Sequence, residues 1–394
     1  MGRRQYGTGS VTRRADGKWV ARIEAGWTAN GTRRRISRTA KTEAEAKRLL
    51  RDLQRDHAAG EEVGGRKITV KAWCDTWLEH QATRVRPKTW ETDASTIRRW
   101  IVPTIGHRKL ADLTPADVRK VTKAVRAAGR TSTTARYAQA VLTRALKAAV
   151  REGHPVPDRV LLVDKPAPAA SDRAALPPAD ALKVLNAASR RPDGSRWVAA
   201  LLQGMRQGEC LGLTWDHVDL DAGEIDISWQ LQTLRYADRD RDLFRIPDGY
   251  EARRLEGAWH LTRPKTQRGQ RIIPMLDWMA EPLEEWRQVA PVSPHGLVWP
   301  RPDGRPRDSK QDREEWWALC GEAGVAHPSG RRYHVHEARN TTASLLLAAK
   351  VDPAIITAIL GHSSIVVSRG YMTIDRGQLR EALRASSALV LPGP

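Results

Sequence analysis

The stretch that decides the fold is residues 336–371, HEARNTTASLLLAAKVDPAIITAILGHSSIVVSRGY. His336 and Arg339 open an apolar run that predicts a helix, on which residues three apart share one face. Both side chains can therefore reach a single phosphate. Residues 352–353, Asp-Pro, predict the start of a second helix, which ends at Gly361. His362 follows directly, and Tyr371 comes nine residues later.

A second His-x-x-Arg pair, His260 and Arg263, lies in an alternating segment beside a proline. On a strand these two side chains would point to opposite faces. In a chain with 51 arginines such a pair also arises by chance. We therefore favour His336 and Arg339 as the functional pair.

Other common catalytic motifs do not occur in the sequence. There is no GxxxxGK[ST] phosphate loop and no HExxH zinc helix. The three cysteines, Cys74, Cys210 and Cys320, are far apart and lack metal-ligand spacing, which indicates reduced structural thiols. We therefore expect neither a metal nor a nucleotide cofactor.

Four ordered motifs resemble those of the tyrosine recombinase (phage integrase) family, in its lambda integrase-like branch with an N-terminal arm-binding domain. Residues 204–215 resemble the first arginine box. Residues 264–266 and 271–274 resemble the hairpin that carries the family's lysine. The segment 336–371 resembles the second box, with 23 residues from Arg339 to His362 and nine to Tyr371. The resemblance covers nearly the whole chain.

The resemblance implies a role for each matching residue. Cleaving a phosphodiester without a metal needs a nucleophile and positive charge on the phosphate oxygens. The implied nucleophile is Tyr371, and the implied proton acceptor is His336. The remaining implied groups are the phosphate-binding Arg206, Arg339 and His362, the proton donor Lys265, and Glu209, which would hold the basic cluster in place.

Some alternatives and departures stay open at these positions. Lys310 also lies in a basic loop, and His334 is close to His336. Asn340 stands where the family often has a histidine, and Glu337-Ala338 replaces the more usual acidic-plus-leucine pair. None of these departures removes a catalytic group.

The charge is uneven along the chain. Net charge is +20, of which residues 1–60 carry +9 and residues 66–165 carry +12, while residues 166–394 carry only +1. A polycationic front half is typical of proteins that bind nucleic acid. No apolar run is long enough to span a membrane, and no signal peptide is evident, so we expect a cytoplasmic protein.

The pattern predicts a multidomain α+β protein with two linkers. We expect an arm-type DNA-binding domain at 1–62, made of a three-stranded sheet plus a helix. A helical core-site DNA-binding domain should follow at 66–155, and a mainly α catalytic domain with a β-hairpin region at 176–394. Residues 224–232 read as one strand and 258–275 as a strand pair, with 234–257 as a charged loop of unknown role.

Arginines on the predicted N-terminal strands are candidate DNA contacts, as in proteins that read DNA with strands. The alternative is a solvated basic edge that resists aggregation. The candidates are Arg13, Arg14, Arg22, Arg33, Arg34, Arg35 and Arg38. Tryptophans at helical spacing in 69–152 indicate core positions rather than base-stacking platforms.

The expected function is that of a site-specific integrase acting on DNA in a bacterial host. Its expected partners are double-stranded DNA at core and arm sites and three further copies of the chain. An excisionase and a DNA-bending host factor are candidate partners, and no membrane is expected. The alternative is a non-catalytic DNA-binding regulator that kept the fold. A C-terminal helix in 377–391 would pack either on its own domain or on a neighbouring subunit.

Overall fold

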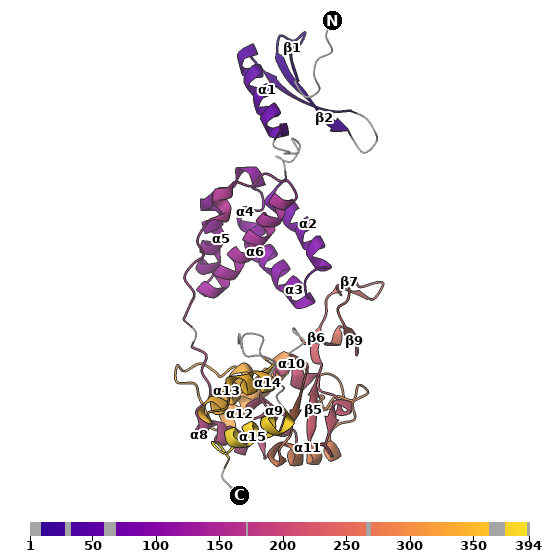
Figure 1. The fold of residues 1–394 in the computed structure, drawn as a ribbon, viewed down its shortest axis with the longest axis vertical. Helices are drawn as coiled ribbons and strands as arrows, with labels where there is room; N and C mark the ends of the chain where they lie inside the picture. Colours follow the sequence, from indigo (N-terminus) through magenta and orange to yellow (C-terminus); the bar gives the residue numbers. More distant parts are fainter. Residues whose placement is uncertain are drawn as a thin grey trace. The chain divides into compact units, whose positions relative to one another are not determined.

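A computed structural model describes residues 9–27, 33–58, 68–170, 172–264, 269–361 and 375–391, with backbone alone at 25–27, 33–34 and 56–58. The chain divides into two compact units, Met1–Ala170 and Ser171–Pro394 (Figure 1). Three of the predicted catalytic residues, Lys265, His362 and Tyr371, lie outside the described residues. Within the described residues, every helix is too short or too polar to cross a membrane.

The first unit begins with a three-stranded antiparallel sheet in which the second strand is central. Its elements are β1 (Ser10–Arg13), β2 (Trp19–Trp27), β3 (Arg33–Ala40) and α1 (Glu43–Ala58). Ala21 and Ile23 of β2 and Leu53 of α1 are buried together, so the helix covers one face of the sheet. The predicted strands and helix are confirmed.

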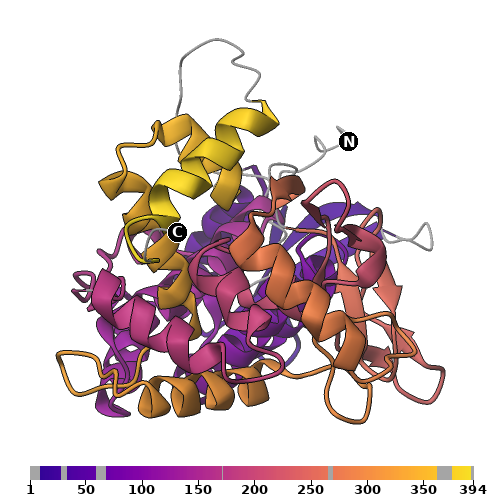
Figure 2. The ribbon, with the colours of Figure 1, turned by 90° about the horizontal axis from the view of Figure 1, so that it is seen from below.

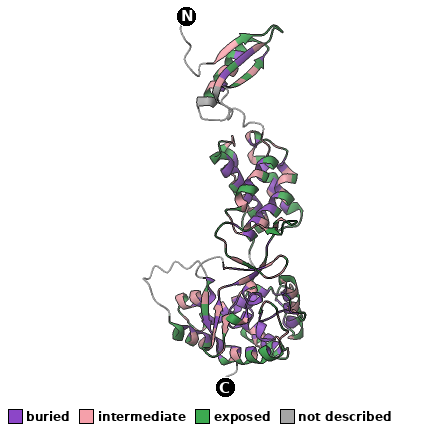
Figure 3. Ribbon diagram, turned by 90° about the vertical axis from the view of Figure 1, so that its right-hand side faces the viewer, coloured by how far each residue is buried: buried purple, intermediate pink, exposed green. Residues whose placement is uncertain are grey.

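A helical group with its own core makes up the rest of the first unit. Its helices are α2 (Val70–Ala82), α3 (Pro87–Thr96), α4 (Val102–Ile105), α5 (Pro115–Ala127), α6 (Ser132–Arg151) and α7 (Asp158–Leu161), with a 3₁₀ turn at Leu110–Asp112. Trp73, Trp77 and Trp90 are buried, and the buried residues appear purple in Figure 3. The indole N–H of Trp73 donates to the Ala145 carbonyl at 2.7 Å. These tryptophans are core residues, as predicted.

The helix that begins at Pro87 continues past Pro103. A π-helical turn, Ile97–Ile101, joins α3 to α4, and Pro103 lies in the first turn of α4. A proline has no N–H to donate, and the π turn shifts the hydrogen bonding by one residue, as in the bond from the Val102 N–H to the Ile97 carbonyl, so a residue without an N–H is accommodated here. The helical run therefore passes Pro103 and ends at Gly106.

The second unit packs helices around two main apolar cores. Its helices are α8 (Pro178–Ala188), α9 (Ser195–Leu201), α10 (Gln207–Leu211), α11 (Asp277–Val289), α12 (Ser309–Glu322), α13 (Val335–Ala348), α14 (Pro353–Leu360) and α15 (Arg376–Ser387). The predicted helices after His336 and Asp352 are confirmed as α13 and α14. Gly361 ends α14 in the left-handed conformation, with φ of 61°.

Short strands form the β part of the second unit. They are β4 (Val218–Asp219), β5 (Glu224–Ile227), β6 (Gln230–Thr233), β7 (Tyr236–Asp238), β8 (Leu243–Phe244), β9 (Ala252–Arg254), β10 (Trp259–Thr262) and β11 (Arg271–Pro274). The sheets run β6-β10-β9, β11-β5-β4 and β7-β8, and all pairings are antiparallel.

Three sequence predictions for this region are wrong. The single strand 224–232 divides into β5 and β6, because Trp229 between them turns into an apolar cluster with Leu211 and Leu261. As a result, β10 pairs with β6 and β11 pairs with β5, and the two do not pair with each other. The segment 234–257 also contains β7, β8 and β9 rather than loop alone.

Candidate active site

A buried carboxylate, Glu209 on α10, lies at the centre of a cluster of arginines. Its Oε1 accepts from Arg206 at 2.5 Å and from Arg271 at 3.1 Å, and its Oε2 accepts from Arg271 at 2.9 Å. The same Oε2 accepts the backbone N–H of Arg206 at 2.8 Å, so Arg206 precedes the helix as its N-cap. The Glu209 side chain is only 1% exposed, whereas that of Arg206 is 33% exposed.

Arg339 on α13 joins the same cluster from the other side. Its Nη1 lies 4.0 Å from Oε2 of Glu209 and donates to the Gly204 carbonyl. Its Nη2 donates to the Leu360 carbonyl at the end of α14. Nη2 of Arg206 donates to the next carbonyl, that of Gly361, at 2.8 Å. The two arginines therefore hold the backbone immediately before His362.

Gly204 makes the approach of Arg339 possible. Its φ is 65°, which L side chains rarely adopt. An added Cβ would lie 2.6 Å from Leu360 Cδ2 and 3.1 Å from Thr342 Cγ2. A side chain at Gly204 would therefore push against Leu360 of α14, whose own carbonyl accepts from Arg339.

The charges in the cluster shift one another's pKa values. Burial alone would raise the pKa of Glu209, but Arg271, Arg206 and Arg339 outweigh it and lower the pKa to about 2. Burial lowers the pKa of Arg339, and its cationic neighbours Arg206 and Arg271 lower it further, to about 9. At pH 7 the carboxylate is charged and Arg339 is protonated, so positive charge exceeds negative charge here.

His336 lies at the exposed start of α13, and the positive charges of the cluster affect its pKa. Its pKa is lowered from 6.5 by partial burial and then by the positive charges of Arg339, Arg173 and Arg206. The imidazole is therefore neutral at pH 7 and is able to accept a proton. By contrast, His260 is buried in β10 against the ring of Phe244, at a centroid distance of 4.5 Å.

Glu337, one of the departures noted in the sequence, has a structural position. It is buried and accepts from the backbone N–H of Ala174 at 3.0 Å and from that of His334 at 2.6 Å. Arg331 donates to both of its oxygens, at 2.9 and 2.6 Å, and also to Asp172. This carboxylate thus holds the chain that enters the second unit beside the start of α13.

The structure brings together Arg206, Glu209, His336 and Arg339 of the predicted site. It describes residues on both sides of the segments that carry Lys265, His362 and Tyr371, but not those residues themselves. Sequence reasoning missed Arg271, which is 6% exposed and bonded to Glu209. The sequence signal for Arg271 was its position in residues 271–274, which resemble part of the hairpin that carries the family's lysine.

The N-terminal arginines do not share one surface. Arg22 and Arg35 lie on the open face of the sheet, opposite the buried Ala21 and Ile23. By strand register, Arg13 and Arg38 alternate with them and lie on the face that α1 covers. Arg14 follows β1, and the side chains of Arg33 and Arg34 are outside the description. Of the candidates whose side chains are described, Arg22 and Arg35 therefore lie on the open face.

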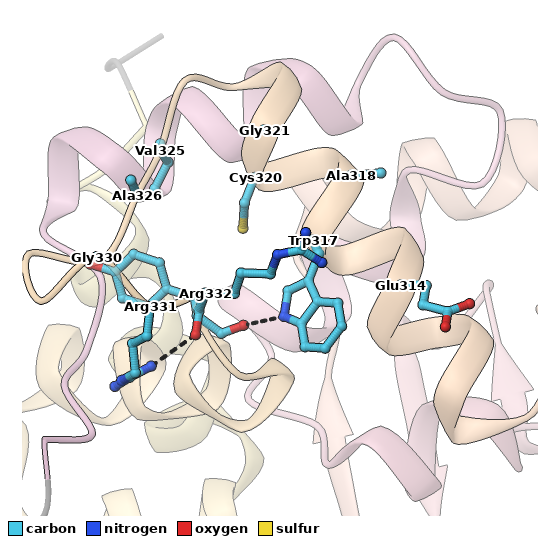
Figure 4. A pocket seen from close by; sticks show the side chains of 11 residues that line it. Glu314, Trp317, Ala318, Cys320, Gly321, Val325, Ala326, Gly330, Arg331 and Arg332 are labelled. Carbon is cyan, nitrogen blue, oxygen red and sulfur yellow. Dashed lines mark hydrogen bonds between the residues drawn. The ribbon is translucent and has the colours of Figure 1, made fainter.

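The second unit also contains a cavity of about 490 Å³, which is lined by residues other than those of the arginine cluster (Figure 4). It is lined by α12 and the chain before α13, including Trp317, Cys320 and Tyr333. The Arg332 guanidinium lies over the Trp317 ring, 4.9 Å from its centroid. None of the predicted site residues that the structure describes lines this cavity.

The C-terminal helix α15 packs on its own unit, one of the two arrangements considered from the sequence. It contacts α13, α14 and β11. Leu379, Ala382 and Leu383 belong to the core that includes Ile359 and Leu360 of α14. Figure 2 shows the C-terminal helix, in yellow, against the orange helices of the same unit. The residues just after the 362–374 segment are therefore anchored beside the arginine cluster.

Helices around a short antiparallel sheet, with Arg206 at the start of α10 and Arg339 on α13 both bonded to carbonyls at the end of α14, fit the tyrosine recombinase class. The phage integrase family model matches residues 178–377, and the model of the phage integrase N-terminal SAM-like domain matches residues 69–124. The chain belongs to the phage integrase family and is a site-specific recombinase of the tyrosine class, as the sequence predicted.

Related proteins agree with this assignment. An integrase of Saccharopolyspora erythraea is 24% identical over 405 residues, covering 91% of each chain. An integrase of Streptomyces ambofaciens is 28% identical over 390 residues, covering 95% of this chain and 93% of the relative.

Solved structures share the fold at low sequence identity. The Tn1549 transposon integrase in complex with a circular intermediate DNA matches with a TM-score of 0.63 at 17% identity, over 81% of this chain and 95% of that one. A lambda integrase dimer bound to a COC′ core site matches with a TM-score of 0.57 at 16% identity, over 95% and 99%.

Proposed function

We propose that this recombinase cuts and rejoins double-stranded DNA through a 3′-phosphotyrosine link on Tyr371, and thereby integrates or excises a mobile element. One observation carries the proposal. Arg206 and Arg339 bond adjacent carbonyls, Gly361 and Leu360, immediately before the segment that continues to Tyr371. A phosphate held by these guanidiniums would lie near the start of the chain that supplies the nucleophile.

The arginines bind the phosphate that is cleaved. A guanidinium has five N–H donors, and its planar fork matches two phosphate oxygens. Arg206 is one-third exposed, so it can contact DNA while Glu209 and Gly361 fix its orientation. Arg339, which is more deeply buried, adds its positive charge to the same cluster. Charge fixed in advance stabilises the crowded transition state without reorganisation.

The reaction exchanges one phosphoester bond for another. The Tyr371 oxygen attacks phosphorus, the new P–O bond to tyrosine forms, and the bond to the 5′-oxygen breaks. Neutral His336 accepts the phenol proton, Lys265 gives a proton to the departing 5′-oxygen, and His362 donates a hydrogen bond to a phosphate oxygen. Attack by a 5′-hydroxyl on the phosphotyrosine reverses these steps and rejoins DNA. The bond energy is conserved, so no ATP is needed, and the protein supplies the charge for which other enzymes use a metal.

Strand exchange requires four such sites on two duplexes. We infer that the helical 66–155 domain binds the core site, that the 1–62 domain binds arm sites, and that 176–394 carries the chemistry. A lambda integrase tetramer bound to a Holliday junction shares the fold of this chain, with a TM-score of 0.55 at 15% identity. The same assembly is proposed for this protein.

Trapping on a nicked suicide substrate tests the proposal. The substrate is the core attachment sequence of the element that carries the gene, nicked so that the released strand end diffuses away. The parent protein should accumulate a covalent DNA adduct, and Tyr371→Phe should not. Tyr236→Phe, which keeps the ring stacked on Phe244 at 4.2 Å, is the matched control and should trap like the parent. Equal trapping by Tyr371→Phe would show that the nucleophile is another residue, and no trapping by the parent would favour a non-catalytic regulator.

A further inference from the structure

Arg271, the first residue of β11, donates four hydrogen bonds at the site, and the proposed reaction gives it no role. Its Nη1 and Nη2 donate to the two oxygens of Glu209 at 3.1 and 2.9 Å. Its Nε donates to the Ile359 carbonyl at 2.7 Å, and Nη1 also donates to the Gly269 carbonyl at 3.0 Å. With 6% exposure, this side chain is enclosed by protein.

Each contact lies on a segment that leads to a different proposed catalytic group. Glu209 holds the side chain and the backbone N–H of Arg206. Gly269 lies four residues after Lys265 in the sequence. Ile359 lies in the last turn of α14, three residues before His362. Three segments that are distant in sequence therefore meet at one guanidinium.

We propose that Arg271 is a positioning residue that sets the spacing of Arg206, Gly269 and the end of α14, and through them the placement of Lys265 and His362, without itself touching DNA. This inference rests on the proposed function of those residues. Arg271 acts through the Glu209 carboxylate and two carbonyls, because each of its three guanidinium nitrogens already donates to one of these groups. It is therefore distinct from Arg206, whose exposed third is available to DNA.

The contacts explain why this position needs arginine rather than lysine. A planar fork can meet both oxygens of Glu209 and still direct Nε to a third group, whereas an ammonium is a point charge. Arg271→Lys keeps the charge but cannot reproduce all of these contacts. Removing an outer contact of this kind from a catalytic cluster typically costs ten- to a hundredfold in activity.

A single-turnover cleavage assay on the full-length chain tests the role. We expect Arg271→Lys to cleave the suicide substrate at least about tenfold more slowly than the parent at saturating DNA. Its Kd for the same DNA should stay within about twofold, because the groups that would contact phosphate remain. Arg307→Lys is the matched control. Arg307 is 7% exposed in the same unit and pairs with Asp193 and Glu315, away from the site segments.

A second variant and a second readout guard against simple misfolding. Arg271→Met should be slower still, and melting temperature, recorded for every variant, should fall no further for Arg271→Lys than for Arg307→Lys. In a Glu209→Gln background, Arg271→Lys should cost less than in the parent, because half of its contacts are already altered.

The outcomes separate this inference from the proposed function. If the parent traps DNA through Tyr371 and Arg271→Lys cleaves at the parental rate, the positioning role is wrong while the function stands. The role is also wrong if the loss appears only as a higher Kd, or if Arg307→Lys slows cleavage equally. If the parent forms no adduct, both proposals fail together.

Discussion

Arg206 and Gly361, 155 positions apart in the sequence, are joined by a hydrogen bond of 2.8 Å from Nη2 to the carbonyl oxygen. The bond ties the residue that caps α10 to the residue that ends α14. Because Gly361 directly precedes His362, the geometry of one proposed phosphate contact depends on the other. The site is thus held by its own arginines before DNA arrives.

The two arginines that we propose bind the phosphate, Arg206 and Arg339, should differ in their effect on stability. Arg339→Ala would leave the buried Gly204 and Leu360 carbonyls unpaired and should destabilise the fold by about 3 kcal/mol. Arg206→Ala, at a one-third exposed position, should cost about 1 kcal/mol. Both variants should lose at least about a hundredfold in cleavage. Urea denaturation followed by tryptophan fluorescence measures the difference, and equal destabilisation would contradict this description of the cluster.

His336 should set the acid limb of the pH–rate profile. Its pKa is lowered from 6.5, so the acceptor stays neutral down to a pH below that value, and cleavage should fall only below it. His336→Ala should remove this limb and slow cleavage by about a hundredfold. His334→Ala, at the exposed neighbouring histidine, should keep both the limb and the rate. Survival of the limb in His336→Ala would assign it to another group.

Glu209 should contribute stability that is lost in acid. Its folded pKa of about 2 lies below its ordinary value of 4.5, so the stabilisation is complete above pH 4.5 and disappears as pH falls toward 2. A difference of this size corresponds to about 3 kcal/mol. Glu209→Gln should flatten the stability curve between pH 5 and pH 2, whereas Glu284→Gln, exposed on α11, should not. A parallel curve for Glu209→Gln would show that the carboxylate is not held as the hydrogen bonds indicate.

The open face of the N-terminal sheet should be the arm-site contact. Arg22→Glu and Arg35→Glu should each weaken binding to arm-site DNA and lower the slope of log affinity against log salt by about one. Arg51 is exposed on α1, the helix that covers the opposite face of the sheet. Arg51→Glu makes the same change of charge there and should have a smaller effect. Equal losses for all three would indicate non-specific attraction by net charge.

The sequence predicted the parts of the site that depend on local spacing. The helix after His336, the glycine that ends α14 and the tryptophan core all follow from periodicity and capping, which act over a few residues. Arg271 could not be chosen among 51 arginines, because its role depends on β11 pairing with β5 and on α14 lying beside it. The strand pairing was wrong for a related reason, since the burial of Trp229 against Leu211 of α10 is a long-range contact.

The most direct test of the central claim is to map the covalent bond itself. The parent protein is trapped on the suicide substrate, digested with a protease and a nuclease, and the peptide that retains a nucleotide is sequenced by mass spectrometry. The predicted product is a 3′-phosphate ester on Tyr371, with no other tyrosine modified. An adduct on a different residue, or on a 5′-phosphate, would contradict it.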